Sequence, residues 1–348
     1  MAGTGDGVPT IRYWIFNYEP HWEAVSKEVD SLVAGLGDGA VASVVSLNMR
    51  DRALQWRGRV KRIPLPHGLP LYPLLRSHAA GAGINHLFAS ASERWLSPWL
   101  SRGRSALTVA KGSSNLGRIE RNADTLRRFR AVVVQSEWDH DLMRQLGVAG
   151  DALWLIRPGI PLAAYRKAHG PFTVLFASSP FAADDFLTRG IQLMVRVAAR
   201  LPEVRFLLAW RGRHLDKLRG LLRDAAVSNV EVRDGVISDM GALYDDVHAA
   251  ALPALEHRSF VPAPRSGLEA LARGKPLLAS RYVGIAESLQ RSGAGVVFEP
   301  TIDGLEDAVR RLQDRYDVHR SAAQPYIAAR FSPATHLELH RRLYRALA

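Results

Sequence analysis

The chain has 348 residues, of which 47% are hydrophobic and 23% charged, with a formal net charge of +12 and no cysteine. The absence of cysteine excludes disulfides, thiolate metal sites and cysteine nucleophiles. No stretch reaches the roughly 18 apolar residues of a membrane-spanning helix, and the Gly-rich opening lacks the pattern of a secretory signal. We therefore expect a cytoplasmic protein, long enough for two domains because single cores stop growing near about 250–300 residues.

In the first half of the chain, apolar runs of strand length alternate with segments of helical period. Val25, Val29 and Leu32 lie on one face of a helix predicted over residues 21–36. A second helix, over 139–146, ends at Gly147. Strands are predicted at 10–17, 40–47, 107–110 and 131–134.

The same alternation restarts after a cluster of Pro and Gly over 157–172, which predicts a domain boundary there. Helices are predicted over 189–200 and 304–312. Strands are predicted at 171–177, 204–209, 230–234, 249–253, 276–280 and 295–299.

Alternating strands and helices predict parallel sheets covered by helices on both faces. We therefore predict an α/β protein with two Rossmann-like, doubly wound domains, over residues 1–165 and 166–331. A C-terminal helix over 332–348 is expected to pack back on the first domain. Ligands of such sheets bind beyond the carboxyl ends of the strands, so a cleft between the two domains is the expected site.

The most informative local pattern runs from Val261 to Ser280, where a Pro-rich turn leads into a helix that ends at Gly274. A proline at Pro264 suits the first helical turn, because its missing N–H costs little there. The amides of the next three residues, Arg265, Ser266 and Gly267, would then offer a seat for phosphate. Glu269 lies one turn further and can accept two hydroxyl hydrogen bonds, as a ribose offers, although an ordinary exposed helical glutamate is the alternative.

From Ala131 to about Leu312 the chain resembles the retaining glycosyltransferases of the GT-B fold, family 4. In that family a helix carries Glu-Ala-(Met/Leu)-Ala-x-Gly-x-Pro, which is matched here from Glu269 to Pro276. Residues 283–295 resemble the family's Gly-Gly-(Ile/Val)-x-Glu segment, with Glu287 at the glutamate. Two further segments, 134–148 and 155–160, match loosely, whereas the first 130 residues match poorly.

The resemblance implies that the second domain binds a nucleotide-diphosphate sugar and that Glu269 holds its ribose. Arg189 precedes Gly190 where the family has Lys-Gly, which implies that this guanidinium grips the diphosphate and acts as the catalytic donor. Ser178 and Ser179 occupy the turn where the family has an arginine. The base is expected near the backbone of Gly235 and Val236. The nucleotide sugar is a substrate, and neither a cofactor nor a metal is expected.

Two positions depart from the family pattern. Val261 stands where the family has a glutamate that contacts the donor sugar, and Pro264 replaces a glycine of the phosphate-facing turn. The candidates to reach the space of the missing acid are Glu256, His257 and Arg258. These departures leave the donor sugar open.

The first domain offers candidates for acceptor contact at the ends of its strands, namely Tyr18, Glu19 and Lys111. It also holds most of the positive charge, with 22 Lys and Arg against 14 Asp and Glu in residues 1–170. The charge is densest over residues 50–62, which predicts attraction to an anionic surface unless this is simply a solvated basic face. Peripheral contact with the inner membrane face is the expected form, and nucleic acid is not expected as a partner.

Together these features predict a retaining, hexosyltransferase-type enzyme. It would move a sugar from a nucleotide-diphosphate donor to a hydroxyl of a glycan, a lipid-linked or a small-molecule acceptor. A nucleotide-sugar epimerase is one alternative, but we find no converging acidic and His groups for it. The other is a GT-B protein without catalysis that binds anionic surfaces or nucleic acid through its basic first domain.

Overall fold

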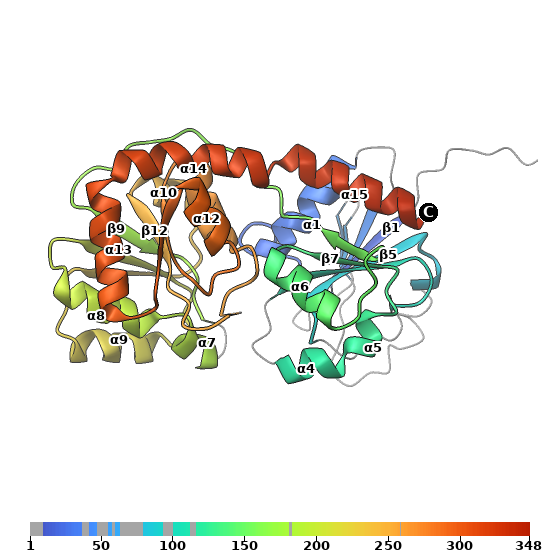
Figure 1. The fold of residues 1–348 in the computed structure, drawn as a ribbon, viewed down its shortest axis with the longest axis horizontal. Coiled ribbons are helices and arrows are strands. Elements are labelled where there is room, and N and C mark those ends of the chain that lie inside the picture. The colour runs from blue at the N-terminus through green and yellow to red at the C-terminus, as the bar shows by residue number, and fades with distance from the viewer. Residues whose placement is uncertain are drawn as a thin grey trace, which may run out of the picture. The chain divides into compact units, whose positions relative to one another are not determined.

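The computed structural model describes residues 10–36, 42–46, 55–57, 60–62, 79–92, 100–111, 116–180, 183–257 and 259–348. For the strands at 55–57 and 60–62 it describes the backbone alone. The chain divides into two units (Figure 1). The first comprises Met1–Gly159 with Pro333–Ala348, and the second comprises Ile160–Ser332. The division therefore falls at residue 160, near the start of the Pro- and Gly-rich segment, where the sequence prediction had placed it at residue 166.

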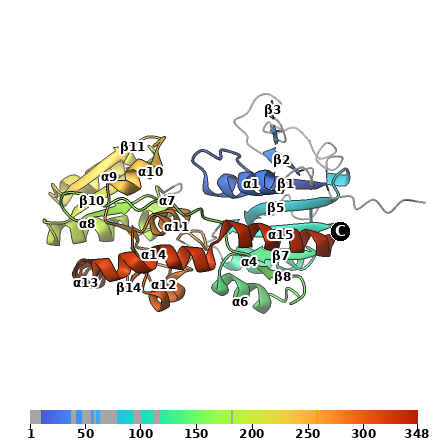
Figure 2. The ribbon, with the colours of Figure 1, turned by 90° about the horizontal axis from the view of Figure 1, so that it is seen from above.

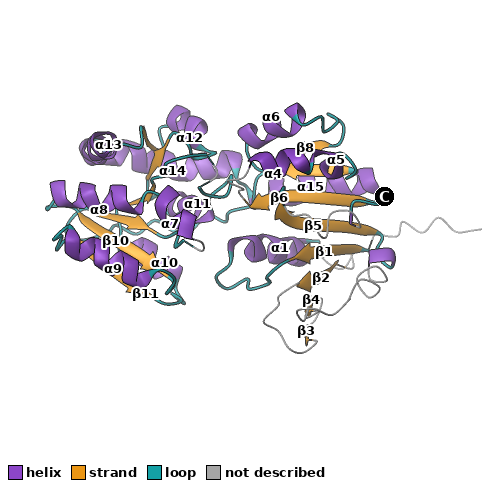
Figure 3. Ribbon diagram, turned by 90° about the horizontal axis from the view of Figure 1, so that it is seen from below, coloured by secondary structure: helices purple, strands orange, loops and turns teal. Residues whose placement is uncertain are grey.

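The first unit is built on a sheet in which the described strands run in the order β3-β4-β2-β1-β5-β6-β7-β8. Figure 3 shows the first six of them in this order across the sheet. The pairs are parallel except β3 with β4, which is antiparallel. The strands are β1 (Ile11–Ile15), β2 (Ala42–Ser46), β3 (Gln55–Arg57), β4 (Val60–Arg62), β5 (Ile84–Ser90), β6 (Ser105–Lys111), β7 (Ala131–Val134) and β8 (Leu153–Leu155).

Helices cover both faces of this sheet (Figure 1). On one face lie α1 (Ala24–Gly35) and α15 (Pro333–Leu347), and on the other lie α4 (Leu116–Arg121), α5 (Ala123–Leu126) and α6 (Glu137–Gln145). The apolar positions of α1 are buried against the strands, as their helical spacing predicts. Both faces of the sheet are therefore dry, which is why its central strands read as nearly continuous apolar runs.

The C-terminal helix α15 belongs to the first unit and runs beside α1 (Figure 2). Leu343 and Tyr344 are buried in the same core cluster as Tyr13 of β1. At the edge of the contact, Arg341 Nη2 donates to the carbonyl of Gly35 at 3.0 Å. The last fifteen-residue helix of the chain thus completes the core of the unit that the chain began with.

The second unit has a parallel sheet in the order β11-β10-β9-β12-β13-β14, the order of a doubly wound nucleotide-binding sheet. Its strands are β9 (Thr173–Phe176), β10 (Arg205–Trp210), β11 (Val230–Asp234), β12 (Ala249–Leu252), β13 (Leu277–Ser280) and β14 (Gly295–Phe298). The prediction of an α/β protein with two Rossmann-like, doubly wound sheets is confirmed.

The helices of the second unit also lie on both faces, with α8 and α9 on one face and α14 on the other (Figure 1). They are α7 (Ala183–Thr188), α8 (Ile191–Arg200), α9 (Leu215–Asp224), α10 (Met240–Asp245), α11 (Arg265–Ala272), α12 (Ala286–Ser292), α13 (Ile302–Asp314) and α14 (Tyr316–Arg330). The helix predicted from residue 189 begins two residues later, because Gly190 takes a left-handed conformation with φ of 73°.

Sequence reasoning did not predict strand β5, although it lies beside β1 at the centre of the first sheet. Its segment contains Asn85 and His86, which interrupt the apolar pattern of a buried strand. Both side chains are buried with partners: Asn85 Oδ1 accepts from Trp14 Nε1 at 2.8 Å, and His86 is hydrogen-bonded through both ring nitrogens. Distant partners make a polar strand acceptable in the core.

Candidate functional site

The second sheet changes its winding direction between β9 and β12, which are hydrogen-bonded neighbours. Segments that follow these two strands meet at the same edge of the sheet, the place where doubly wound sheets bind ligands. Gly190 permits the close approach there, because a Cβ at this residue would lie 1.9 Å from the carbonyl oxygen of Pro253. With its positive φ as well, this position accepts only glycine.

Arg189 organises the turn that follows β9. Its Nη1 donates to the carbonyls of Ser178 and Ser179 at 3.1 and 2.9 Å, and lies 3.0 Å from the Ser178 hydroxyl. Its Nη2 lies 3.4 Å from Asp185. Its buried Nε has no hydrogen-bond partner among the described residues. The side chain is 19% exposed, so the guanidinium holds the turn and still reaches the surface.

A second arginine, Arg211, lies at the same edge and was missed by sequence reasoning. It follows the last residue of β10, and the register between β10 and β9 brings it beside the turn at Ser178 and Ser179. The Ser179 hydroxyl donates to the carbonyl of Ala209 at 3.1 Å and ties the two strand ends together. The available signal was an arginine directly after a strand next to the switch point.

Electrostatics at this edge favour an anion. Burial lowers the pKa of Arg189; Asp185 opposes this shift and the like charge of Arg211 adds to it. Two guanidinium groups thus lie near each other with Asp185 as the carboxylate that acts on Arg189. An arrangement that brings like charges together is suited to a ligand carrying more than one negative charge.

Helix α11 provides the second half of the edge. Pro264 is its N-cap residue, and its carbonyl accepts from the amides of Gly267 and Leu268 at 3.1 Å each. Within the part of the chain that the structure describes, the amides of Arg265 and Ser266 have no acceptor. They are therefore the N–H groups suited to an anion.

Gly267 does not serve as predicted, because its amide is already used within the helix. Its role is steric. A Cβ at this residue would lie 2.8 Å from the side chain of Leu252 and 3.2 Å from that of Leu277. The absence of a side chain therefore lets α11 pack closely against β12 and β13, which positions its N-terminus at the sheet edge.

Glu269 lies one turn into α11 and is 21% exposed. Its Oε1 accepts from Arg265 Nε at 2.9 Å, and its Oε2 lies 3.4 Å from the hydroxyl of Tyr244. That hydroxyl also donates to the carbonyl of Ser266 at 2.9 Å. The carboxylate is thus held at the same helix end as the open amides.

The remaining predicted donor residues lie on loops of the same unit. Gly235 has φ of 110°, and the next residue, Val236, is 66% exposed at the carboxyl end of β11. Near the position of the missing acid, Val261 is half-buried and Glu256 is exposed. The His257 ring packs edge-on against Tyr282 at 4.9 Å, and Arg258 lies outside the described residues.

In the first unit, the structure changes the interpretation of Tyr18. This residue is buried, and its hydroxyl donates to Asp30 Oδ1 at 2.6 Å, so it braces the loop after β1 rather than offering its ring to an acceptor. The half-buried Glu19 receives a different structural role, because its amide donates to the Ser26 hydroxyl at 2.9 Å. Lys111 ends β6.

Of the predicted basic segment, Arg50, Arg52 and Arg59 lie outside the described residues, and the others are on β3 and β4. None of the described helices is long and apolar enough to cross a membrane. Across the described ranges, no three His, Asp or Glu side chains are grouped as metal ligands would be.

Residues 172–315 match the family model described as glycosyl transferases group 1. The segment is a group 1 glycosyltransferase domain. It contains β9 to α13, and therefore Arg189, the N-terminus of α11 and Glu269. The resemblance drawn from the Glu269–Pro276 motif is confirmed at the level of the family.

Solved structures of similar fold are GT-B proteins. Sucrose-phosphate synthase from Thermosynechococcus elongatus aligns with a TM-score of 0.77 at 15% identity, over 97% of this chain and 99% of that one. The Anabaena protein HepE in complex with UDP and glucose gives 0.75 at 13%, over 97% and 100%. WaaG, a glycosyltransferase involved in lipopolysaccharide biosynthesis, gives 0.72 at 14%, over 97% and 99%. At these identities the likeness establishes the fold.

Two curated relatives carry a different description. Probable DNA ligases of Mycolicibacterium paratuberculosis and Mycobacterium avium are 28% identical over 227 and 228 residues, 59% of this chain in each case. The chain spans about two fifths of the length of these relatives, 41% and 42%.

Proposed function

We propose that this chain is a retaining glycosyltransferase that moves a sugar from a nucleotide-diphosphate donor to a hydroxyl of a glycan, a lipid-linked or a small-molecule acceptor. One observation carries the proposal. At the switch point of a group 1 glycosyltransferase domain, the carboxylate of Glu269 lies one turn from two amides without acceptors, on the sheet edge that also holds Arg189. A ribose and a diphosphate require these two kinds of group at adjacent positions.

Each part of the donor has a proposed partner. Glu269 accepts the ribose hydroxyls, and the amides of Arg265 and Ser266 bind phosphate oxygens. Arg189 and Arg211 neutralise the diphosphate from the ends of β9 and β10. The base lies against the backbone of Gly235 and Val236. UDP is the first nucleotide to test, because HepE of similar fold was solved with UDP and glucose.

The chemistry asks little covalent work of the protein. The bond between the anomeric carbon and the diphosphate oxygen breaks, the acceptor oxygen bonds to that carbon from the same face, and the acceptor proton leaves with the diphosphate. Positioning of the reactants and stabilisation of the departing negative charge then supply the rate. Arg189 is the catalytic residue of this scheme, and we expect it to act without a bound metal or cofactor.

The sugar half of the donor site follows a different design from the nucleotide half. Val261 offers no hydrogen-bond acceptor where an acid would contact the sugar. We infer that the exposed turn after β12, which includes Glu256, supplies that contact. Removal of the Glu256 carboxylate should therefore change the preference among donor sugars and leave the affinity for the free nucleoside diphosphate unchanged.

A thermal-shift screen tests the nucleotide half directly. UDP, GDP, ADP and dTDP are compared, and a ligand at about 100 times its dissociation constant should add about 2.7 kcal/mol to the free energy of unfolding. We expect at least one nucleoside diphosphate to raise the melting temperature, and this response to disappear in Arg189→Ala and Glu269→Ala. Glu287→Ala is the matched control, because Glu287 is an exposed helical glutamate paired with Arg291. No response to any nucleotide would reject the proposal.

The alternatives give different outcomes in the same preparation. Salt-dependent binding to generic DNA or to anionic vesicles, without a nucleotide response, would favour a protein that has lost catalysis and binds anionic partners. Conversion of the donor sugar in the absence of any acceptor would favour an epimerase. For a transferase, NMR of the product anomer decides between retention and inversion.

A further inference from the structure

Tyr244, which no sequence motif singled out, lies directly behind the carboxylate that we assign to the ribose. It is in the last turn of α10 and is 1% exposed. Its hydroxyl donates to the carbonyl of Ser266 at 2.9 Å and lies 3.4 Å from Glu269 Oε2. One buried phenol therefore touches both the first turn of α11 and the functional carboxylate.

The phenol keeps its proton in this position. Burial raises the pKa of Tyr244 well above its usual value, and the negative charge of Glu269 adds to the shift. A neutral hydroxyl has one proton to donate, shared here between the carbonyl at 2.9 Å and the carboxylate at 3.4 Å. The side chain thus remains a donor toward Glu269 over the whole physiological pH range.

Arg265 holds the other oxygen of the same carboxylate at 2.9 Å. The last torsion of a glutamate side chain is soft, so a carboxylate with a single partner can rotate. One donor at each oxygen restricts this rotation. Because a carboxylate can accept about four hydrogen bonds, these protein donors are compatible with two ribose hydroxyls on the same group.

We propose that Tyr244 is a positioning residue for ribose recognition: it holds the Glu269 carboxylate in the orientation that accepts both ribose hydroxyls and thereby makes the site selective for ribonucleotides over 2′-deoxyribonucleotides. The inference rests on the proposed nucleotide-sugar function. It adds to that function a determinant of donor specificity that lies outside the group 1 helix motif.

The test is the ratio of two affinities. The nucleoside diphosphate that responds in the thermal screen and its 2′-deoxy counterpart are titrated calorimetrically into the wild type, Tyr244→Phe and Tyr316→Phe. The wild type should prefer the ribonucleotide by about tenfold or more, because the lost hydrogen bond is to a charged group. In Tyr244→Phe this ratio should fall to about threefold or less, mainly through weaker binding of the ribonucleotide.

Tyr316→Phe is the matched control, since its hydroxyl donates to the carbonyl of His248 at 3.3 Å within the same unit. It loses a comparable hydrogen bond without contact to Glu269 and should keep the wild-type ratio. Arg265→Met removes the donor at the other carboxylate oxygen and should lower the ratio as well, which keeps the test decisive if Tyr244→Phe does not fold.

The outcomes separate this inference from the proposed function. A wild type that binds no nucleoside diphosphate rejects both. A wild type that discriminates between the two nucleotides, with full discrimination retained in Tyr244→Phe or, if that variant does not fold, in Arg265→Met, overturns the positioning role and leaves the function standing. Equal affinity of the wild type for both nucleotides removes Glu269 from the ribose and overturns the inference by itself.

Discussion

Glu28 in the first unit and Glu269 in the second occupy corresponding places, each on a helix that follows a strand beside the switch point of its sheet. Their surroundings differ. Glu28 is 5% exposed, and both of its oxygens accept from Gln135 Nε2 at 2.9 Å, whereas Glu269 is 21% exposed. Two carboxylates at equivalent positions of the same kind of sheet therefore have different uses.

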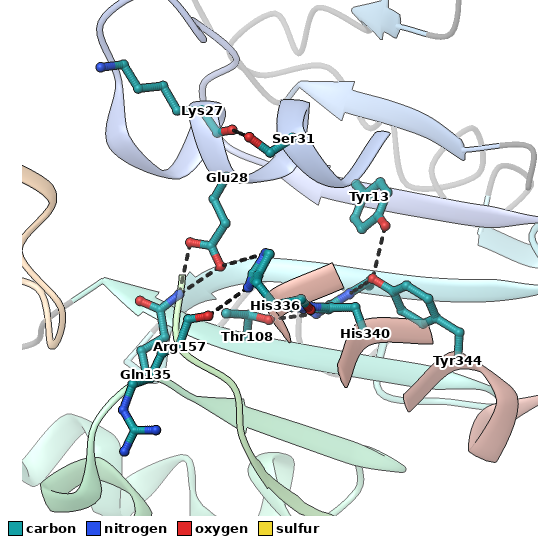
Figure 4. A network of polar contacts seen from close by, with 11 residues as sticks. Tyr13, Lys27, Glu28, Ser31, Thr108, Gln135, Arg157, His336, His340 and Tyr344 are labelled. Atoms are coloured by element: carbon teal, nitrogen blue, oxygen red, sulfur yellow. Dashed lines mark hydrogen bonds and ion pairs between the residues drawn. The ribbon is translucent and has the colours of Figure 1, made fainter. Parts of the chain in front are cut away.

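The element that makes the difference is α15. Its His336 donates through Nδ1 to the carbonyl of Arg157 at 2.7 Å, because a carbonyl only accepts, and turns Nε2 toward Glu28 Oε1 at 3.9 Å (Figure 4). Further along the helix, His340 Nδ1 donates to the His336 carbonyl and Tyr344 is hydrogen-bonded to Tyr13. The returning helix buries the polar groups of the first unit in a structural network.

The comparison teaches that a carboxylate at a sheet edge is identified as functional by what covers it and which groups hold it. Glu28 is enclosed by an amide and by a histidine from the end of the chain. Glu269 is held by Arg265 of its own helix and by Tyr244, and it keeps access to solvent. The first arrangement stabilises the fold, and the second suits a ligand.

The largest expected effect is the loss of the buried carboxylate in the first unit. Glu28→Ala should lower the free energy of unfolding by about 3–5 kcal/mol, because it leaves buried polar partners uncompensated. Urea denaturation measures the change. Glu287→Ala, which removes an exposed helical glutamate, should change it by about 0.5 kcal/mol or less. If the two variants lost similar stability, the carboxylate of Glu28 would not be a structural anchor.

Acid should weaken the first unit through His86. Burial, and then the nearby His336, lowers the pKa of His86 from 6.5 to about 3. Between these two values the unfolded chain binds a proton that the folded chain does not, so stability is full above pH about 6.5 and falls as the pH decreases. At pH about 4.5 the loss from this residue should be about 2–3 kcal/mol.

His86→Gln isolates this contribution, because glutamine can keep hydrogen bonds without titrating in this range. The difference in unfolding free energy between wild type and variant should shrink by that amount from pH 7 to pH 4.5. A constant difference across this range would mean that His86 is not kept neutral by the fold.

The smallest expected effect concerns Arg211 in the second unit. Arg211→Ala should weaken the binding of the nucleoside diphosphate by about 1 kcal/mol, because an exposed guanidinium contributes modestly to a charged ligand. The affinity for the nucleoside monophosphate should change less, and the difference should shrink at high salt. Arg219→Ala, an exposed arginine of α9, is the control. An equal effect of both variants would mean that Arg211 acts only through net charge.

The sequence predicted the group 1 domain and its donor edge well, since the informative residues lie within one short segment. Glu269, Gly274 and Pro276 are local features of a helix and its ends, and Gly190 marks the start of α8 directly. Arg211 and Tyr244 escaped prediction, because each is brought to the edge by the pairing or packing of a separate element. Gly267 was assigned to the ligand, although its missing side chain serves helix–sheet packing instead.

The sequence by itself determined the α/β class, the two doubly wound sheets and the family of the second unit, because strand and helix periodicity and the motif around Glu269 are properties of neighbouring residues. Only the tertiary structure decided which polar groups are available to a ligand. Tyr18 and Glu28 read as accessible polar side chains until the fold buries them, and Tyr244 reads as a core aromatic until its hydroxyl meets Glu269. The reason is physical: whether a charge serves the fold or a ligand depends on the burial and partners that distant segments supply.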